Sequence, residues 1–115
     1  GKPLREFLWS EEMADASVHV LLNVDFKDTC MEGSKDIRNC HINVGTGKEV
    51  CIREVAEMIM KEVQFKGDLR WDSSKPDGTM RKLTDVSKLH SLGWHHKVEI
   101  DEGIERLYEW YLKGV

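Results

Sequence analysis

The residues with the most chemistry to offer lie in one short loop, residues 73–83 (SSKPDGTMRKL). Pro76 lacks an amide hydrogen and has a fixed φ, and the pair Asp77–Gly78 favours a turn. The loop carries one carboxylate and three cations, Lys75, Arg81 and Lys82. Ammonium and guanidinium groups beside turn amides suit a phosphate diester. An ordinary solvated turn has the same composition, so the loop alone leaves both interpretations open.

A second candidate for phosphate binding is the turn Gly45–Lys48 (GTGK). A P-loop requires glycine where this chain has Ile42, and serine or threonine where it has Glu49. The third glycine of a dinucleotide fingerprint is replaced by Val50. The pattern therefore favours a tight turn between a strand and a helix over a nucleotide site.

Other reactive side chains do not form catalytic or metal-binding sets. Cys40 and His41 are adjacent, and neighbouring side chains on a strand point to opposite faces, so they cannot share a proton. The pair His95–His96 has no third ligand at a useful spacing, which predicts no metal site. Neither Tyr108 nor Tyr111 is followed four residues later by lysine, so the couple used for hydride chemistry is absent.

Composition limits the class of protein. A chain of 115 residues with 40% hydrophobic residues predicts one modest core and a single domain, residues 1–115. A net charge of −4 argues against nucleic acid as a partner. No apolar run approaches the roughly 18 residues of a membrane span. No targeting segment is recognisable, and the chain begins at Gly1 without methionine, so we expect a piece of a larger protein.

The three cysteines, Cys30, Cys40 and Cys51, form no Cys-x-x-Cys pair. Their odd number and spacing predict reduced thiols in a cytoplasmic protein. They favour neither a disulfide framework nor a zinc site.

Helical periodicity predicts about four helices. Ser10 is expected to cap the first, over residues 11–24, with a buried face at Ala14, Ser17, Val18, Leu21 and Val24. A second is expected over residues 52–63. A short one, which Asp85 caps, is expected through about Leu92, and Gly93 ends it. The last has an apolar stripe at Ile104, Leu107, Tyr108, Tyr111 and Leu112.

Short strands are expected at residues 4–9, 41–44 and 69–71, and residues 25–40 read as a variable surface loop. Strands that alternate with helices predict a mixed α/β class.

Taken in order, these segments resemble a known family. The matching stretches are GKPLREFL (1–8), HINVGTG (41–47) with IRE (52–54), SKPDGT (74–79) with RKL (81–83) and DV (85–86), LGW (92–94) and YEWYL (108–112). The chain resembles the C-terminal part of the GDP-L-fucose synthases, in the extended short-chain dehydrogenase/reductase superfamily. The loop KPDGT with RKL is the most specific of these stretches.

The resemblance implies a small substrate-binding domain without the N-terminal Rossmann core. It implies that Arg5 holds the diphosphate of a GDP-sugar, and that Asp77 and Lys82 contact the bound nucleotide-sugar. These roles agree with the chemistry, because a planar guanidinium and an ammonium suit a diphosphate, whereas a carboxylate accepts hydrogen bonds from hydroxyls or a base edge.

The resemblance also implies the activity of an intact, homodimeric enzyme. Such an enzyme converts GDP-4-keto-6-deoxy-D-mannose to GDP-L-fucose by 3,5-epimerisation and NADPH-dependent 4-reduction. The family's cofactor loop and catalytic residues match nothing in these 115 residues, so we expect no catalytic residue, no metal and no activity in this piece alone.

Three departures from the family pattern stand out. Residues 9–12 are WSEE where Tyr-Val-Asp-Asp is usual, and Met80 replaces a proline. Cys51 stands where threonine or serine caps a helix, at an expected cost of about 1 kcal/mol. The open alternatives are another sugar-nucleotide epimerase or dehydratase of the superfamily, and a free-standing nucleotide-sugar-binding or interaction module.

Overall fold

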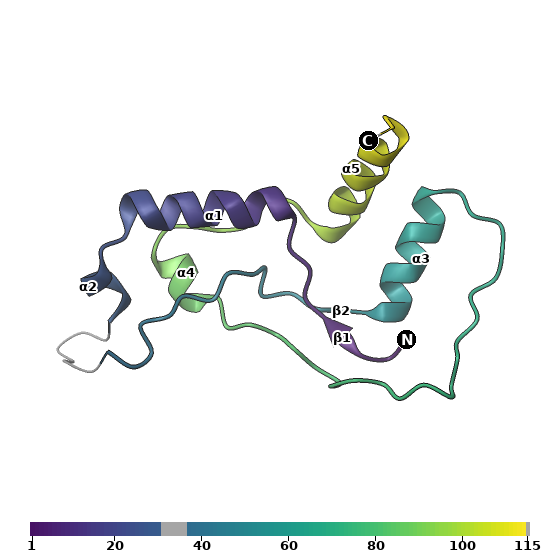
Figure 1. The fold of residues 1–115 in the computed structure, drawn as a ribbon, viewed down its shortest axis with the longest axis horizontal. Helices are drawn as coiled ribbons and strands as arrows, with labels where there is room; N and C mark the ends of the chain where they lie inside the picture. Colours follow the sequence, from purple (N-terminus) through teal and green to yellow (C-terminus); the bar gives the residue numbers. More distant parts are fainter. Residues whose placement is uncertain (31–36, 115) are drawn as a thin grey trace.

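The computed structural model describes residues 1–30 and 37–114. In order, the elements of this part are β1 (Leu4–Arg5), α1 (Ser10–Asn23), α2 (Phe26–Thr29), β2 (Val50–Cys51), α3 (Ile52–Glu62), α4 (Ser87–Ser91) and α5 (Ile100–Leu112). Figure 1 shows α1 above α4 at one end of the molecule and α3 beside α5 at the other, with β1 and β2 between them. A long irregular segment runs from α3 around the edge to α4.

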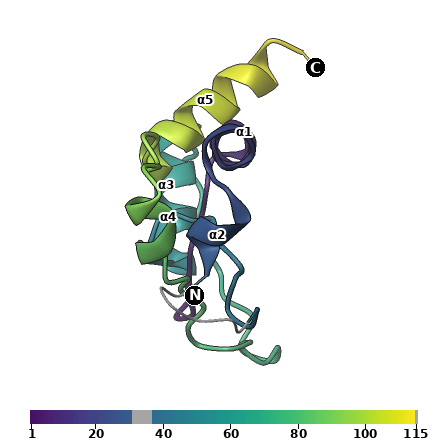
Figure 2. The same ribbon diagram turned by 90° about the vertical axis from the view of Figure 1, so that its left-hand side faces the viewer.

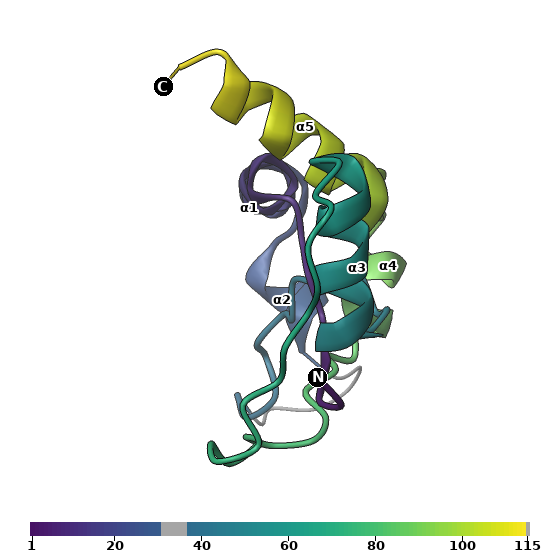
Figure 3. The ribbon, with the colours of Figure 1, turned by 90° about the vertical axis from the view of Figure 1, so that its right-hand side faces the viewer.

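The body is a thin plate. Its extents are 57 × 36 × 20 Å, and the edge-on views of Figures 2 and 3 show the short dimension. Its radius of gyration is 17.9 Å, whereas a compact domain of this length has about 13 Å. The segment is therefore much less compact than a typical independent domain.

The sheet consists of two short antiparallel strands, with Leu4 opposite Cys51 and Arg5 opposite Val50. The expected strand at residues 4–9 is thus paired only at its first two residues. The expected strands at 41–44 and 69–71 lie in segments without strand pairing, and β2 was not expected. A strand depends on a neighbour that supplies its hydrogen bonds, and sequence alternation does not reveal whether that neighbour is present.

The helices follow their predicted positions closely, although their caps differ. α1 begins at Ser10, so the N-cap is Trp9 and not Ser10 as expected. Cys51 does precede α3, and the Glu54 carboxylate accepts a 2.9 Å hydrogen bond from the Cys51 amide, which supplies half of a capping box.

The short helix α4 agrees only in part with its expected signals, because its N-cap is Val86 and not Asp85. Asp85 Oδ1 accepts a hydrogen bond from the Ser87 amide at 2.9 Å, and Gly93 ends the segment with φ +91°, as a C-terminal glycine does. Within the expected surface loop 25–40, residues 26–29 form α2, and residues 31–36 lie outside the described part.

The small core lies between α1 and α4. Ala16, Leu89 and Trp94 are buried there, and Leu8, Val20, Ile42 and Val44 pack partly against them. Trp94 Nε1 also donates a 2.8 Å hydrogen bond to Asp15 on α1. Glu12 of α1 is buried as well, and its two carboxylate oxygens accept hydrogen bonds from the amides of Lys97 and Val98. Polar and apolar contacts together hold residues 94–98 along α1.

The predicted buried face of α1 was wrong. Leu21 is 80% exposed and Val18 is 53% exposed, whereas the buried residues of the helix are Glu12 and Ala16. The apolar stripe of α5 is also largely open, with Leu107, Tyr111 and Leu112 exposed. Periodicity shows that a helix has an apolar face, but it does not show which part of a protein covers that face.

None of the described helices is both long and apolar enough to cross a membrane. In residues 1–30 and 37–114, no group of three or more histidines, cysteines and carboxylates is placed to hold a metal ion.

The core predicts a contrast between two leucines of the 115-residue chain. Leu89 is fully buried, so Leu89→Ala is expected to lower the free energy of unfolding by about 2–5 kcal/mol through lost burial and a cavity. The control Leu21→Ala removes an exposed side chain and is expected to change it by less than about 0.5 kcal/mol. Urea unfolding measures both, and equal losses would contradict this core.

Candidate functional site

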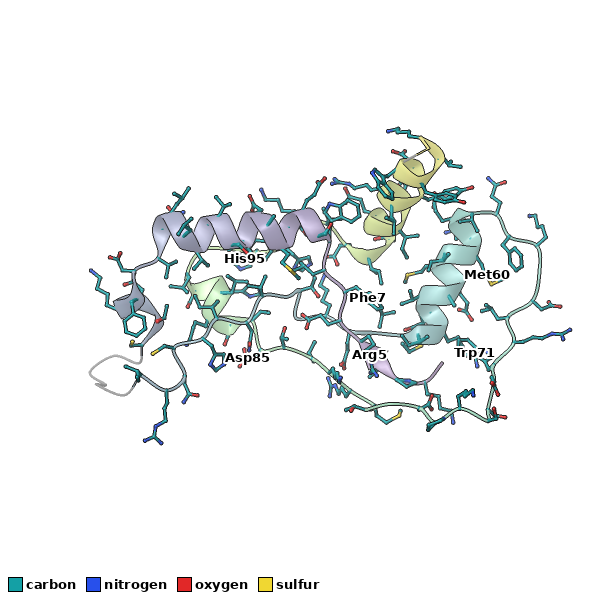
Figure 4. The ribbon with its side chains drawn as sticks, in the orientation of Figure 1. Arg5, Phe7, Met60, Trp71, Asp85 and His95 are labelled. Carbon is teal, nitrogen blue, oxygen red and sulfur yellow. The ribbon has the colours of Figure 1, made fainter. Side chains whose placement is uncertain are left out.

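The loop 73–83 is docked against β1. The Leu4 amide donates to the Met80 carbonyl oxygen at 2.8 Å, and Arg5 Nη1 donates to the Thr79 carbonyl oxygen at 2.8 Å. A Cβ added at Gly78 would lie 3.4 Å from Arg5 Nη2. Figure 4 labels Arg5 at β1. The structure therefore brings Arg5 directly beneath the turn at Gly78 and Thr79.

The other two predicted site residues are free to meet a ligand. Asp77 and Lys82 are both exposed. Across the described part of the chain, neither side chain has a hydrogen bond or an ion pair. They do not contact Arg5 directly, but the Thr79 carbonyl that Arg5 binds is only two residues from Asp77 and three from Lys82. The carboxylate and the ammonium thus belong to the loop that docks on the Arg5 guanidinium of β1.

Arg81, a third cation of the loop, has a structural partner. Its Nε lies 2.6 Å from Glu49 Oε1, and the Glu49 side chain is only 14% exposed. The second oxygen of Glu49 is buried and has no hydrogen-bond partner among the described residues. The ion pair fastens the loop to the segment before β2. It also removes Arg81 from the cations that face solvent without a partner, which leaves Lys75 and Lys82.

Glu6 holds three distant segments together beside Arg5. Its Oε1 accepts hydrogen bonds from the amides of Thr46 and Gly47, both at 2.7 Å. Its Oε2 accepts from the amide and the hydroxyl of Thr84, at 3.0 and 2.7 Å. Burial raises the pKa of Glu6, but these hydrogen bonds outweigh burial and hold the pKa below its ordinary value.

The same carboxylate explains the Gly45–Gly47 turn. A Cβ at Gly45 would collide with Glu6 Oε1 and with Thr84 Oγ1, so a larger residue there would displace both groups from their hydrogen bonds. The amides of Thr46 and Gly47, which a phosphate-binding turn would direct to its ligand, are already bonded to Glu6. The interpretation of this stretch as a structural turn therefore agrees with the geometry.

The N-terminal end of the loop is also held. The Trp71 indole packs against Gly1, and the Arg53 guanidinium lies 4.9 Å from its ring centre. Asp72 Oδ1 accepts hydrogen bonds from the amide and the hydroxyl of Ser74, which lower the pKa of Asp72. The segment between Ser74 and Thr79 is therefore held at both ends, by the contacts of Trp71 and Asp72 on one side and by the bond from Arg5 to Thr79 on the other.

The sequence analysis missed the anchors Glu6, Glu49 and Thr84. Glu6 carried one usable signal, because Leu4, Glu6 and Leu8 alternate with more polar or exposed positions and place a carboxylate in an inward-facing row. A charge at such a position needs partners when it is buried. Glu49 and Thr84 carried no comparable local signal.

The full length of the chain is similar to segments of known proteins. No protein-family model matches the sequence. GDP-L-fucose synthase 1 of Arabidopsis thaliana is 47% identical over 115 residues, which is all of this chain and 32% of that protein. A GDP-6-OMe-4-keto-L-xylo-heptose reductase of Campylobacter jejuni is 45% identical and superposes with a TM-score of 0.91, over 99% of this chain and 32% of that one.

This chain is homologous to one segment of the GDP-L-fucose synthases and GDP-heptose reductases. These are enzymes of the extended short-chain dehydrogenase/reductase family, and the chain spans about a third of their length. A GDP-mannoheptose C4 reductase of Campylobacter jejuni, solved with NADP bound, is 45% identical with a TM-score of 0.84, over 97% of this chain and 32% of that one. The 115-residue chain thus has the fold of one part of those reductases.

The Glu6 cluster predicts a pH-dependent stability. Glu6→Gln is expected to lower the free energy of unfolding at neutral pH by about 1–3 kcal/mol, because the amide group cannot accept on both sides and leaves a donor unpaired. The wild-type carboxylate has a lowered pKa, so its contribution is full above the ordinary value of 4.5 and is lost as the pH falls below it.

Urea unfolding of the wild type and of Glu6→Gln across this acidic range measures the effect. The difference between the two proteins is expected to shrink as the pH falls. Glu57→Gln, at an exposed position of α3, is the control and is expected to change little. A gap between wild type and Glu6→Gln that stays constant with pH would contradict the cluster.

Proposed function

We propose that the chain is the GDP-sugar-binding part of a GDP-L-fucose synthase, which converts GDP-4-keto-6-deoxy-D-mannose to GDP-L-fucose by 3,5-epimerisation and NADPH-dependent 4-reduction. The observation that carries the proposal is the position of Arg5. Its guanidinium binds the Thr79 carbonyl of loop 73–83, two residues from the unpaired Asp77 and three from the unpaired Lys82. The similarity to GDP-L-fucose synthases along the whole chain supports the assignment.

Each residue of the site has a distinct role in this proposal. Arg5 binds the diphosphate, because Nη1 makes both backbone contacts and leaves the donors on Nε and Nη2 for phosphate oxygens. Lys82 adds a second positive charge, and Asp77 accepts hydrogen bonds from sugar hydroxyls or from the base. The contacts of Glu6 and Glu49 hold the loop and Arg5 in fixed relative positions. Little conformational entropy is therefore lost when the ligand binds.

In this proposal, the other functions of the enzyme belong to the two thirds of the related enzymes that this chain does not match. In the proposal, that portion binds NADPH and supplies the catalytic residues, the intact enzyme is a homodimer, and the 115-residue segment alone is inactive. The open apolar faces of α1 and α5 support this, because soluble proteins rarely leave faces of this kind uncovered. They argue against a free-standing binding module.

A second candidate activity is reduction of a GDP-linked keto-heptose without fucose synthesis. The observation that favours it is the superposition on a heptose reductase, with a TM-score of 0.91 at 45% identity. Both candidates place the same diphosphate on Arg5, so they differ only in the sugar that is bound and reduced.

The test is a binding and turnover series with the full-length protein. GDP-sugars are expected to bind more tightly than UDP-sugars, and NADPH oxidation is expected with the 4-keto-6-deoxy sugar. Turnover of a GDP-keto-heptose in place of the deoxy sugar would select the second candidate. Tighter binding of UDP-sugars would overturn both, and product formation by the 115-residue segment alone would contradict its proposed inactivity.

Arg5→Ala in the full-length protein is expected to weaken GDP-sugar binding by about 1.5–3 kcal/mol, the range for a hydrogen bond to a charged group. Arg5→Lys is expected to recover only part of the loss, because an ammonium lacks the planar fork. Calorimetric titration with GDP-sugar measures both. Arg106→Ala is the control, because Arg106 pairs with Glu102 on α5. An unchanged affinity in Arg5→Ala would remove Arg5 from the site.

A further inference from the structure

Two of the three cysteines lie within contact distance of each other. The Sγ atoms of Cys30 and Cys40 are 3.2 Å apart, and both residues are free thiols of intermediate burial. The number and spacing of cysteines in the sequence gave no sign of this pair. The third, Cys51, lies at the start of α3 and provides an internal comparison.

Groups other than sulfur hold the two thiols together. Lys88 Nζ on α4 donates hydrogen bonds to the carbonyl oxygens of Thr29, Asn39 and His41, at 3.0, 2.6 and 3.0 Å. These carbonyls belong to the residue before Cys30 and to the residues on either side of Cys40. The next residue of α4, Leu89, is fully buried in the core, and this burial holds the backbone of Lys88 in place.

The pair is open to small reagents. An open cavity of about 450 Å³ is lined by Asp28, Thr29, Cys30, Ser87, Lys88 and Ser91. Cys30 thus lies on the wall of a solvent-filled space, with the Lys88 ammonium beside it. The Lys88 charge favours a disulfide reagent that carries carboxylates, and it offsets the Asp28 carboxylate of the same lining.

We propose that Cys30 and Cys40 are a redox modification site, at which thiol–disulfide exchange with a low-molecular-weight disulfide of the glutathione class closes a reversible intramolecular disulfide. In the first step the Cys30 thiolate attacks one sulfur of the reagent, a mixed disulfide forms and one glutathione thiolate leaves. In the second step Cys40 attacks the Cys30 sulfur, the protein disulfide forms and the second glutathione leaves. Two protein thiols are oxidised by two electrons, and one glutathione disulfide is reduced to two thiols.

The order of the steps follows from the environment of the thiols. The hydrogen bond with Cys30, followed by burial, raises the pKa of the Cys40 thiol, which makes it the poorer first nucleophile. Cys30 faces the cavity and meets the reagent first. Formation of the mixed disulfide removes the Cys30 thiol as the hydrogen-bond partner of Cys40, so Cys40 is released to act as the resolving thiol.

The experiment is disulfide mapping of the full-length protein after equilibration in glutathione buffers of stepped potential. Acid quenching, alkylation, proteolysis and mass spectrometry are expected to show a linked Cys30–Cys40 peptide that disappears on reduction, while Cys51 stays alkylated as a thiol. Free Cys30 and Cys40 in the most oxidising buffer, stable separate glutathione adducts on them, or a Cys51 linkage to either would overturn the proposal.

Two variants test the steps separately. Cys40→Ser is expected to stop at the mixed disulfide on Cys30, because the resolving thiol is missing; a glutathione adduct that forms on Cys51 instead would overturn the assignment of Cys30. Lys88→Met is expected to make closure about tenfold less favourable, which is a shift of about 30 mV for a two-electron couple. An unchanged midpoint in folded Lys88→Met would overturn the role of the lysine. Neither outcome depends on the GDP-sugar proposal.

Discussion

The Glu6 carboxylate is the interaction on which the candidate site depends. It accepts four hydrogen bonds from the turn at Thr46 and Gly47 and from Thr84, and so joins three segments that lie far apart in the sequence. A carboxylate with several donors is well compensated for partial burial, which is why a charged residue can occupy an inward position. Because Arg5 directly precedes Glu6, these hydrogen bonds also fix where the Arg5 guanidinium contacts the loop.

The helices were predictable because their signals are local. The spacing of apolar residues located α1, α3 and α5 to within a few residues, and Asp85 and Gly93 marked the limits of the segment that contains α4. The strands and the buried face of α1 were not predictable in the same way. Both depend on neighbours supplied by other parts of the protein, and Leu21 remains exposed although its spacing marks it as apolar helix face.

The residues of the candidate site also differ in whether the sequence could reveal them. Arg5, Asp77 and Lys82 were chosen through family resemblance, and the chemistry of their side chains agreed with that choice. Their supports, Glu6 and Glu49, act through partners 32–78 residues away, and no local pattern encodes such pairings. The chain is similar to both fucose synthases and heptose reductases. In the proposed function Arg5 binds the diphosphate and not the sugar, and a segment with that role would suit GDP-sugars that differ in the sugar.

The plate-like shape has a thermodynamic consequence for the segment on its own. With a thickness of 20 Å, few side chains lie far from water, and Ala16, Leu89 and Trp94 form most of the central core. Heat-capacity change on unfolding scales with the apolar surface that folding removes from water. We therefore expect the stability of the segment alone to vary less steeply with temperature than that of a compact domain of the same length.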